Sequence, residues 1–232
     1  SGAVAGRLGL SGVPVMAETV ALHTIFELMR ATGARVHLCR MSSAAGLELL
    51  RQARQDGLAV SADVAVHHLH LIDIDIGYFD PNMRVDPPFR AQRDREALRT
   101  ALQSGVIDAI CSDHTPVDDD EKQLPFAEAA AGSSGLELLL PLTLKWASES
   151  KVDLALAIDR LTRQPATVLG IEAGVIAPGA AADLCVFDLE DRWVVNASSL
   201  HSQGKHTPYW GRELVGRNRL TLVAGRMVVN HL

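Results

Sequence analysis

Apolar side chains recur at every third or fourth position along several stretches of the chain, and short apolar runs lie between these stretches. In residues 16–31, Leu22, Phe26 and Met29 fall on one helical face, and Gly33 follows as a stop signal. The same periodicity predicts further helices over 44–55, 93–104, 135–148 and 154–162. Runs rich in β-branched residues predict strands over 35–39, 58–64 and 106–111. The alternation predicts an α/β fold with a parallel sheet wrapped by helices.

The pattern changes after about Gly170. Glycine and proline punctuate short β-rich runs, of which 182–189 is one strand and 220–230 a hairpin with Ala224 and Gly225 at its turn. We therefore predict two domains, an α/β part over 1–170 and a small β unit over 171–232. Residues 1–10 have no helical pattern and no initiator Met, so we expect a loop there and a chain that was cut from a longer one.

Composition narrows the class of protein. The chain has 232 residues and a formal net charge of -6, which argues against nucleic acid and anionic membranes as partners because both favour a basic face. Its apolar runs are shorter than the ~18 residues of a membrane span. Three cysteines, far apart and odd in number, do not form a disulfide framework, so we expect a reducing cytoplasm.

Candidate chemistry gathers where predicted strands end. Ser112, Asp113 and His114 directly follow a buried strand, so a partly desolvated carboxylate there could bind a metal or move a proton. The alternative is that these residues only cap a turn. His67, His68 and His70 follow another strand, and imidazole is a good zinc ligand. Adjacent histidines on an extended chain point to opposite faces, which favours loop histidines bonded to the backbone.

Seven ordered segments together resemble the dihydroorotases, cyclic amidohydrolases of pyrimidine synthesis, over essentially the whole length. The segments are 7–18 (RLGLSGVPVMAE), 62–71 (ADVAVHHLHL), 84–90 (RVDPPFR), 107–122 (IDAICSDHTPVDDDEK), 135–142 (GLELLLPL), 174–188 (GVIAPGAAADLCVFD) and 202–211 (SQGKHTPYWG). The resemblance implies the later strands and helices of a TIM barrel and part of a small β-sandwich domain.

The resemblance also implies a chemistry. Dihydroorotases use one or two zinc ions to activate the water that opens the ring amide of dihydroorotate and gives N-carbamoyl-aspartate. By position, Asp113 would be a metal ligand and the catalytic proton shuttle, and His114 would contact the substrate. The family's earlier metal ligands would lie before Ser1, so we expect the C-terminal part of a longer protein with about the last half of the barrel strands.

Three positions depart from the family pattern. Arg40 stands where the family has a zinc-ligating histidine, and a guanidinium cannot bind a cation. His37 lies three residues earlier, so on an extended strand it would point to the other face and could not substitute. Val117 replaces a substrate-contacting histidine, and Asp86 replaces an asparagine, so both are degenerate substrate-binding positions.

These departures favour a dihydroorotase-like protein that is inactive as this chain. Arg40 could occupy the lost metal site as an ion pair with Asp113. The resemblance includes non-catalytic homologues that assemble with aspartate transcarbamoylase, so association with that enzyme, or with itself, is the expected role. An active zinc dihydroorotase is the alternative, and another cyclic amidohydrolase such as a hydantoinase or allantoinase is a third.

Overall fold

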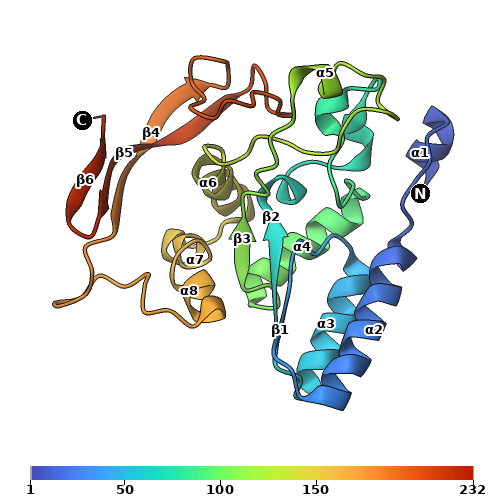
Figure 1. The fold of residues 1–232 in the computed structure, drawn as a ribbon, viewed down its shortest axis with the longest axis horizontal. Helices are drawn as coiled ribbons and strands as arrows, with labels where there is room; N and C mark the ends of the chain where they lie inside the picture. Colours follow the sequence, from blue (N-terminus) through green and yellow to red (C-terminus); the bar gives the residue numbers. More distant parts are fainter. Residues whose placement is uncertain (1, 232) are drawn as a thin grey trace.

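A computed structural model describes residues 2–231 of the protein (Figure 1). Its first sheet is parallel, in the order β1-β2-β3, with Val36 paired to Val60 and Ala65 to Cys111. The strands are β1 (Val36–Leu38), β2 (Val60–Ala65) and β3 (Ala109–Cys111). A TIM barrel has eight strands, so three are fewer than the half that we expected.

Helices cover this sheet and carry much of the core. α3 follows β1 and packs against both α2 and α4, and its Leu47 and Leu50 are fully buried. The larger helices of this part are α2 (Val15–Thr32), α3 (Ala44–Gln55), α4 (Gln92–Ser104) and α6 (Leu139–Ser150). The shorter helical segments are Ala3–Leu8 (α1), Asp119–Lys122 (α5), Leu154–Asp159 (α7), Arg163–Leu169 (α8), and the 3-10 turns Val66–Leu69, Asp73–Ile76 and Pro81–Met83. None of the helices of residues 2–231 is long and apolar enough to cross a membrane.

A second, antiparallel sheet lies at the opposite end of the molecule from α2 and α3 (Figure 1). It consists of β4 (Leu184–Val194), β5 (Glu213–Val223) and β6 (Arg226–Asn230), in that order. The predicted hairpin is confirmed, because Ala224 and Gly225 form the turn between β5 and β6 with φ of 48° and 77°. β5 packs on α6. Gly216 has a φ of 101°, in the left-handed region that favours glycine, and a Cβ atom there would lie 2.4 Å from the Leu144 side chain.

Several predicted bounds were wrong. Residues 3–8 form the exposed helix α1 rather than a loop, ended by Gly9 in the left-handed region. α6 begins at Leu139, four residues late, because residues 136–138 form a turn, in which Leu138 N donates to the oxygen of Gly135. The backbone N–H groups of Gly135 and Leu136 donate to His114 Nδ1. The predicted helix 154–162 ends at Asp159, and α8 follows as a separate helix.

One carboxylate fixes the loop that follows β1. Glu18 on α2 accepts hydrogen bonds from the backbone N–H groups of Ser42 and Ser43, at 3.0 and 3.2 Å, and from both hydroxyls. Ser43 also caps α3, because its Oγ accepts from Gly46 N at 3.0 Å. Glu18 therefore holds the segment that leads out of β1 against the start of α3.

Replacing Glu18 by alanine should destabilise the fold. Four donors lose a charged acceptor, and all four belong to the fully buried Ser42 and Ser43. We expect a loss of about 2–4 kcal/mol in the free energy of unfolding, measured by urea denaturation. The control is Glu27→Ala on the same helix, whose exposed pair with Arg30 should cost less than about 0.5 kcal/mol. Equal effects of the two variants would contradict this role.

Candidate functional site

Asp63 joins the ends of the three parallel strands. This buried carboxylate on β2 lies 3.0 Å from His37 Nε2 of β1 and accepts from the backbone N–H of Arg40 at 2.7 Å. Cys111 at the end of β3 donates its thiol to Asp63 at 3.4 Å. One side chain of β2 thus contacts β1, the segment that follows β1 and the end of β3, close to Arg40 and Asp113.

Arg40 and Asp113 form an ion pair at these strand ends. Arg40 Nη1 donates to Asp113 Oδ1 at 3.1 Å and to the backbone oxygen of Asp86 at 2.9 Å. The Asp113 side chain is nearly buried, whereas that of Arg40 is 41% exposed. Both residues have positive φ, 60° and 47°. The ion pair expected from the sequence is present, and the guanidinium lies on the carboxylate that the family would use for a metal.

Two buried histidines form the wall behind Asp113. His67 Nε2 lies 3.3 Å from Asp113 Oδ2, and the rings of His67 and His68 are 5.1 Å apart and both contact Phe89. The expectation that adjacent histidines point to opposite faces was wrong, because residues 66–69 form a 3-10 turn and not an extended strand. His70 does bond to the backbone as expected, through Nε2 to the oxygen of Leu142 at 2.9 Å.

The electrostatics of the wall follow from burial and charge. Burial alone would raise the pKa of the Asp113 carboxyl, but the facing His67 and Arg40 outweigh it and hold that pKa below its usual range. Burial and the neighbouring His67 lower the pKa of His68 to about 3. Asp113 is therefore an anion already neutralised by Arg40, and His68 is a neutral imidazole at physiological pH.

The other predicted site residues lie nearby but differ in setting. His114 accepts from the backbone N–H groups of Gly135 and Leu136 at its Nδ1, so a neutral ring carries its proton on Nε2. Asp86 is exposed and touches Arg40 through its backbone oxygen. Val117 is buried. The catalytic or substrate-binding roles of Asp113, His114, Asp86 and Val117 stay predictions.

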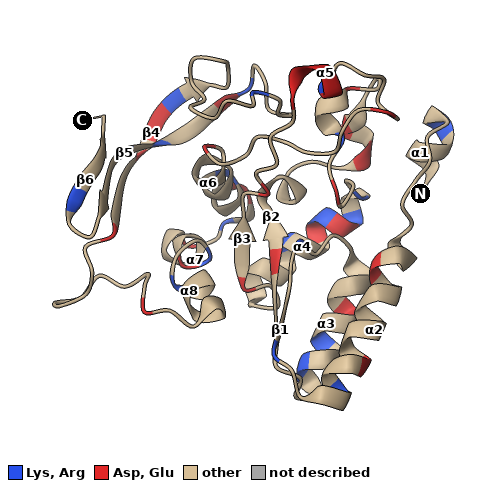
Figure 2. Ribbon diagram, viewed as in Figure 1, with Lys and Arg blue, Asp and Glu red and all other residues tan. Residues whose placement is uncertain are grey.

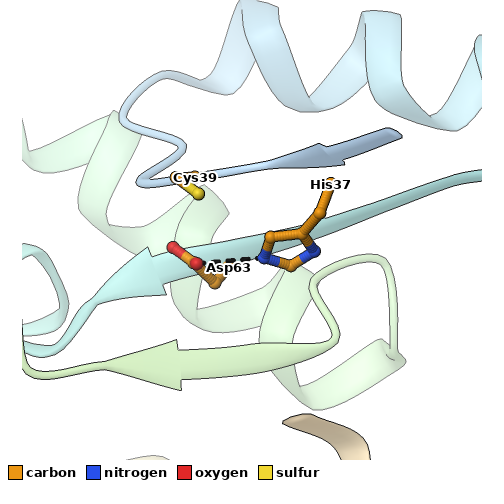
Figure 3. A group of neighbouring side chains, drawn as sticks. All are labelled: His37, Cys39 and Asp63. Atoms are coloured by element: carbon orange, nitrogen blue, oxygen red, sulfur yellow. Dashed lines mark hydrogen bonds and ion pairs between the residues drawn. The ribbon is translucent and has the colours of Figure 1, made fainter. Parts of the chain in front are cut away.

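The zinc that the family implies does not fit around Arg40. A zinc ion there would face a guanidinium, which has no lone pair to offer and repels a cation. A different group could hold a metal, since His37, Cys39 and Asp63 converge between β1 and β2 with ligand atoms within 4.8 Å of one another (Figure 3). Nitrogen, sulfur and oxygen are all zinc donors. Burial and Asp63 raise the pKa of the Cys39 thiol, which disfavours its thiolate in the absence of a metal.

Sequence reasoning missed this group for a specific reason. It treated residues 37 to 40 as one extended strand, but β1 ends at Leu38 and Arg40 has φ of 60°, so strand alternation does not relate the side chains of His37 and Arg40. Asp63 is not among the site residues predicted from the sequence. Register could have found it, because parallel pairing places His37 beside Ser61, two residues before Asp63 on the same face.

Comparisons with known proteins place the chain in one family. The sequence model of the amidohydrolase family matches residues 12–228 of the chain. The chain is 40% identical over 229 residues to a dihydroorotase from Anaeromyxobacter dehalogenans, which covers 98% of this chain and 53% of that protein. It is 42% identical over 226 residues to a dihydroorotase-like protein from Pseudomonas aeruginosa, with coverage of 97% and 53%. The chain spans about half the length of these curated relatives.

Solved structures agree on the fold. An L-hydantoinase (dihydropyrimidinase) from Arthrobacter aurescens superposes with a TM-score of 0.88 at 28% identity, covering 94% of this chain and 50% of that one. A D-hydantoinase from Thermus sp. has a TM-score of 0.86 at 22% identity, over 98% and 55%, and supports the fold alone. The architecture is thus α/β, part of a TIM barrel with a small C-terminal β unit. The chain belongs to the amidohydrolase family. Within that family it is similar to the dihydroorotases and dihydroorotase-like proteins.

The low pKa of His68 makes stability depend on pH. In the unfolded chain His68 takes up a proton near pH 6.5, but in the folded chain it does not until about pH 3. The contribution of His68 to the free energy of unfolding is therefore complete above about pH 6.5 and is lost as the pH falls toward 3. His68→Leu should reduce the slope of unfolding free energy against pH between 6 and 4 by about 1.4 kcal/mol per pH unit. Urea denaturation across this range measures it. The exposed His23→Leu is the control, and an unchanged slope in His68→Leu would refute the assignment.

Proposed function

We propose that the chain is part of a dihydroorotase-like protein of pyrimidine biosynthesis that lacks the metal-dependent hydrolysis and acts as a structural partner of aspartate transcarbamoylase in the cytoplasm. The observation that carries the proposal is the ion pair of Arg40 with Asp113, at 3.1 Å. The family's chemistry needs a metal ligand at the first position and a free carboxylate at the second.

The ion pair removes both requirements at once. Arg40 replaces an imidazole lone pair with a permanent positive charge, so the position repels the ion that it would have bound. Asp113 is neutralised by that charge, and its lowered pKa makes it a poor acceptor for a proton from water. A group that must accept a proton and then return it to a leaving nitrogen needs a pKa closer to the working pH.

The substrate positions support the same proposal. Dihydroorotate and N-carbamoyl-aspartate are both anions, and Asp86 adds an exposed negative charge where the family offers an amide. Val117 is buried and offers no hydrogen bond. His114 keeps a donor on Nε2, since backbone N–H groups occupy its Nδ1. One of the three substrate-binding positions therefore retains its chemistry.

Exposed apolar surface supports a structural role. Within residues 2–231, β1 and β3 each pair only with β2, and sheet edges of this kind attract a partner strand or need a cover. The second sheet also exposes large apolar side chains, more than scattered single residues would explain. These are Val186, Leu189, Val194, Val215, Val223, Met227 and Val228. We propose that the β unit, residues 171–232, is a separate domain whose apolar surface is covered by aspartate transcarbamoylase or by another copy of the protein.

A second candidate is an active zinc enzyme that opens cyclic amides. It is favoured by the relatives named dihydroorotase, by the 28% identical hydantoinase, and by the retained Asp113 and His114. In that case the protein would act on dihydroorotate, or on another cyclic amide such as a hydantoin or allantoin. Arg40 would have to leave Asp113 before a metal could bind, at the cost of a nearly buried, unpaired carboxylate.

Restoring the ligand should restore zinc binding. Arg40→His replaces the guanidinium with an imidazole, so zinc content measured by mass spectrometry should rise relative to the wild type, while Arg40→Lys should not change it. Cys39→Ala in each background identifies zinc held instead by the group of His37, Cys39 and Asp63. Wild-type protein that binds zinc at Asp113 and hydrolyses dihydroorotate would contradict the proposal and favour the second candidate.

The partnership has its own test. The wild-type protein and aspartate transcarbamoylase from the same cells should elute together from a size-exclusion column, because the exposed apolar side chains of the second sheet are then covered. Val215→Glu together with Val228→Glu places charge among these side chains and should weaken the complex at least tenfold, about 1.4 kcal/mol. The control is Glu48→Lys, at an exposed position of α3. Separate elution at micromolar concentration would exclude a stable complex.

A further inference from the structure

A second polar cavity lies where the barrel part meets the second sheet. It has a volume of about 320 Å³ and is lined from α4, α6, the start of β5 and the segment that precedes β5. Neither Arg40 nor Asp113 lines it, so it is separate from the candidate site described above. A cavity of this volume suits a small ligand.

Positive charge exceeds negative charge in the lining. The charged residues are Arg95, Arg99, Lys145 and Arg212 against Glu149 and Glu213. Arg99 and Lys145 share Glu149, whereas Arg95 pairs with Glu96 and Glu213 with Arg192, both outside the lining. Within residues 2–231, Arg212 has no carboxylate partner, and its guanidinium lies over the ring of Tyr209 at 5.7 Å. Acidic and basic residues alternate along α4 (Figure 2). The excess of positive charge in the cavity therefore arises where α4, α6 and the segment before β5 come together.

Two buried polar atoms in this lining have no hydrogen-bond partner among the described residues. Tyr209 is 3% exposed, and its hydroxyl is unpaired. The His70 side chain is 4% exposed, and its Nδ1 is unpaired, 3.9 Å from Glu149. An unpaired buried polar group costs about 1–3 kcal/mol, so a fold that keeps two beside one cavity leaves room for a ligand to pair them.

The hydrogen bonds show what each atom can offer. His70 Nε2 faces the oxygen of Leu142 at 2.9 Å and must donate, since a carbonyl only accepts. Burial lowers the pKa of His70 to about 4, so the ring is neutral and Nδ1 is an acceptor. Burial raises the pKa of Tyr209, so its hydroxyl stays protonated and can donate. The cavity thus presents a neutral donor, a neutral acceptor and surplus cations.

We propose that this cavity is a binding site for a small anion that carries both acceptor oxygens and a hydroxyl hydrogen, with hydrogen phosphate as its simplest member. The acceptor oxygens face the Tyr209 hydroxyl and the Arg212 guanidinium. The hydroxyl hydrogen is donated to His70 Nδ1. The site is independent of the function proposed above, because it uses none of the residues on which that function rests.

Sulfate is the matched competitor for the test. It resembles phosphate in shape and charge but has no hydrogen to donate at neutral pH, so it leaves His70 Nδ1 unpaired. At pH 7.5 and equal ionic strength, phosphate at about ten times a millimolar dissociation constant should raise the melting temperature by about 3 °C or more. Sulfate should raise it by a clearly smaller amount. Equal shifts for the two anions would overturn the proposal in favour of general salt effects.

Tyr209→Phe removes one oxygen atom and makes the sharpest variant. Because the hydroxyl is unpaired in the free protein, its loss should leave the melting temperature unchanged or higher without phosphate. The same variant should lose most of the phosphate-induced rise. A Tyr209→Phe protein that keeps the full rise would overturn the proposal, whatever its own stability.

Two arginines provide a matched pair. Arg212→Gln should weaken phosphate binding at least tenfold in titration calorimetry. Arg217 also lies over an aromatic ring, that of Trp193 at 5.7 Å, but it does not line the cavity. Arg217→Gln should therefore bind phosphate like the wild type. Equal losses in both variants, or no loss in either, would show that the cavity does not hold the anion.

Discussion

The carboxylate of Asp63 is the constraint on which the parallel part of the molecule depends. It contacts His37, the Arg40 backbone and Cys111, so a single buried anion joins the ends of β1, β2 and β3. A buried carboxylate without such partners would cost several kcal/mol, and here the partners come from β1, from the segment that follows β1 and from the end of β3. The same contacts set the left-handed backbone of Arg40, from which its side chain reaches Asp113.

The contact of the Arg40 guanidinium with Asp113 determines the chemistry of the site. In an amidohydrolase the carboxyl ends of the strands hold a cation, and here the protein supplies its own in the form of a guanidinium. Either a bound metal ion or the Arg40 guanidinium would balance the charge of Asp113. The guanidinium therefore explains how the fold keeps a nearly buried carboxylate where a metal-ligating residue is replaced by arginine. Under the proposed function, the protein lacks the ability to activate a water molecule, because a guanidinium has no open coordination position.

The sequence predicted elements whose signals are local and left out those set by tertiary contacts. Periodicity located α2, α3 and α4 to within a residue, and Ala224-Gly225 located the β5–β6 turn. The hydrogen bond from Gly135 N to His114, twenty-one residues away, precedes α6, and no local pattern reports it. The pairing of Arg40 with Asp113 could be inferred because the family motif marks both positions. The cavity lined by Tyr209 could not be inferred from the sequence, since α4, α6 and β5 come together only after folding.

Anomalous diffraction at the zinc edge, from crystals of the wild-type protein grown or soaked with zinc, tests the central claim most directly. The account predicts electron density for the Arg40 guanidinium against Asp113 and no anomalous peak between them. An ordered peak within about 2 Å of the Asp113 carboxylate, the usual zinc–oxygen distance, with the Arg40 side chain turned away, would contradict it.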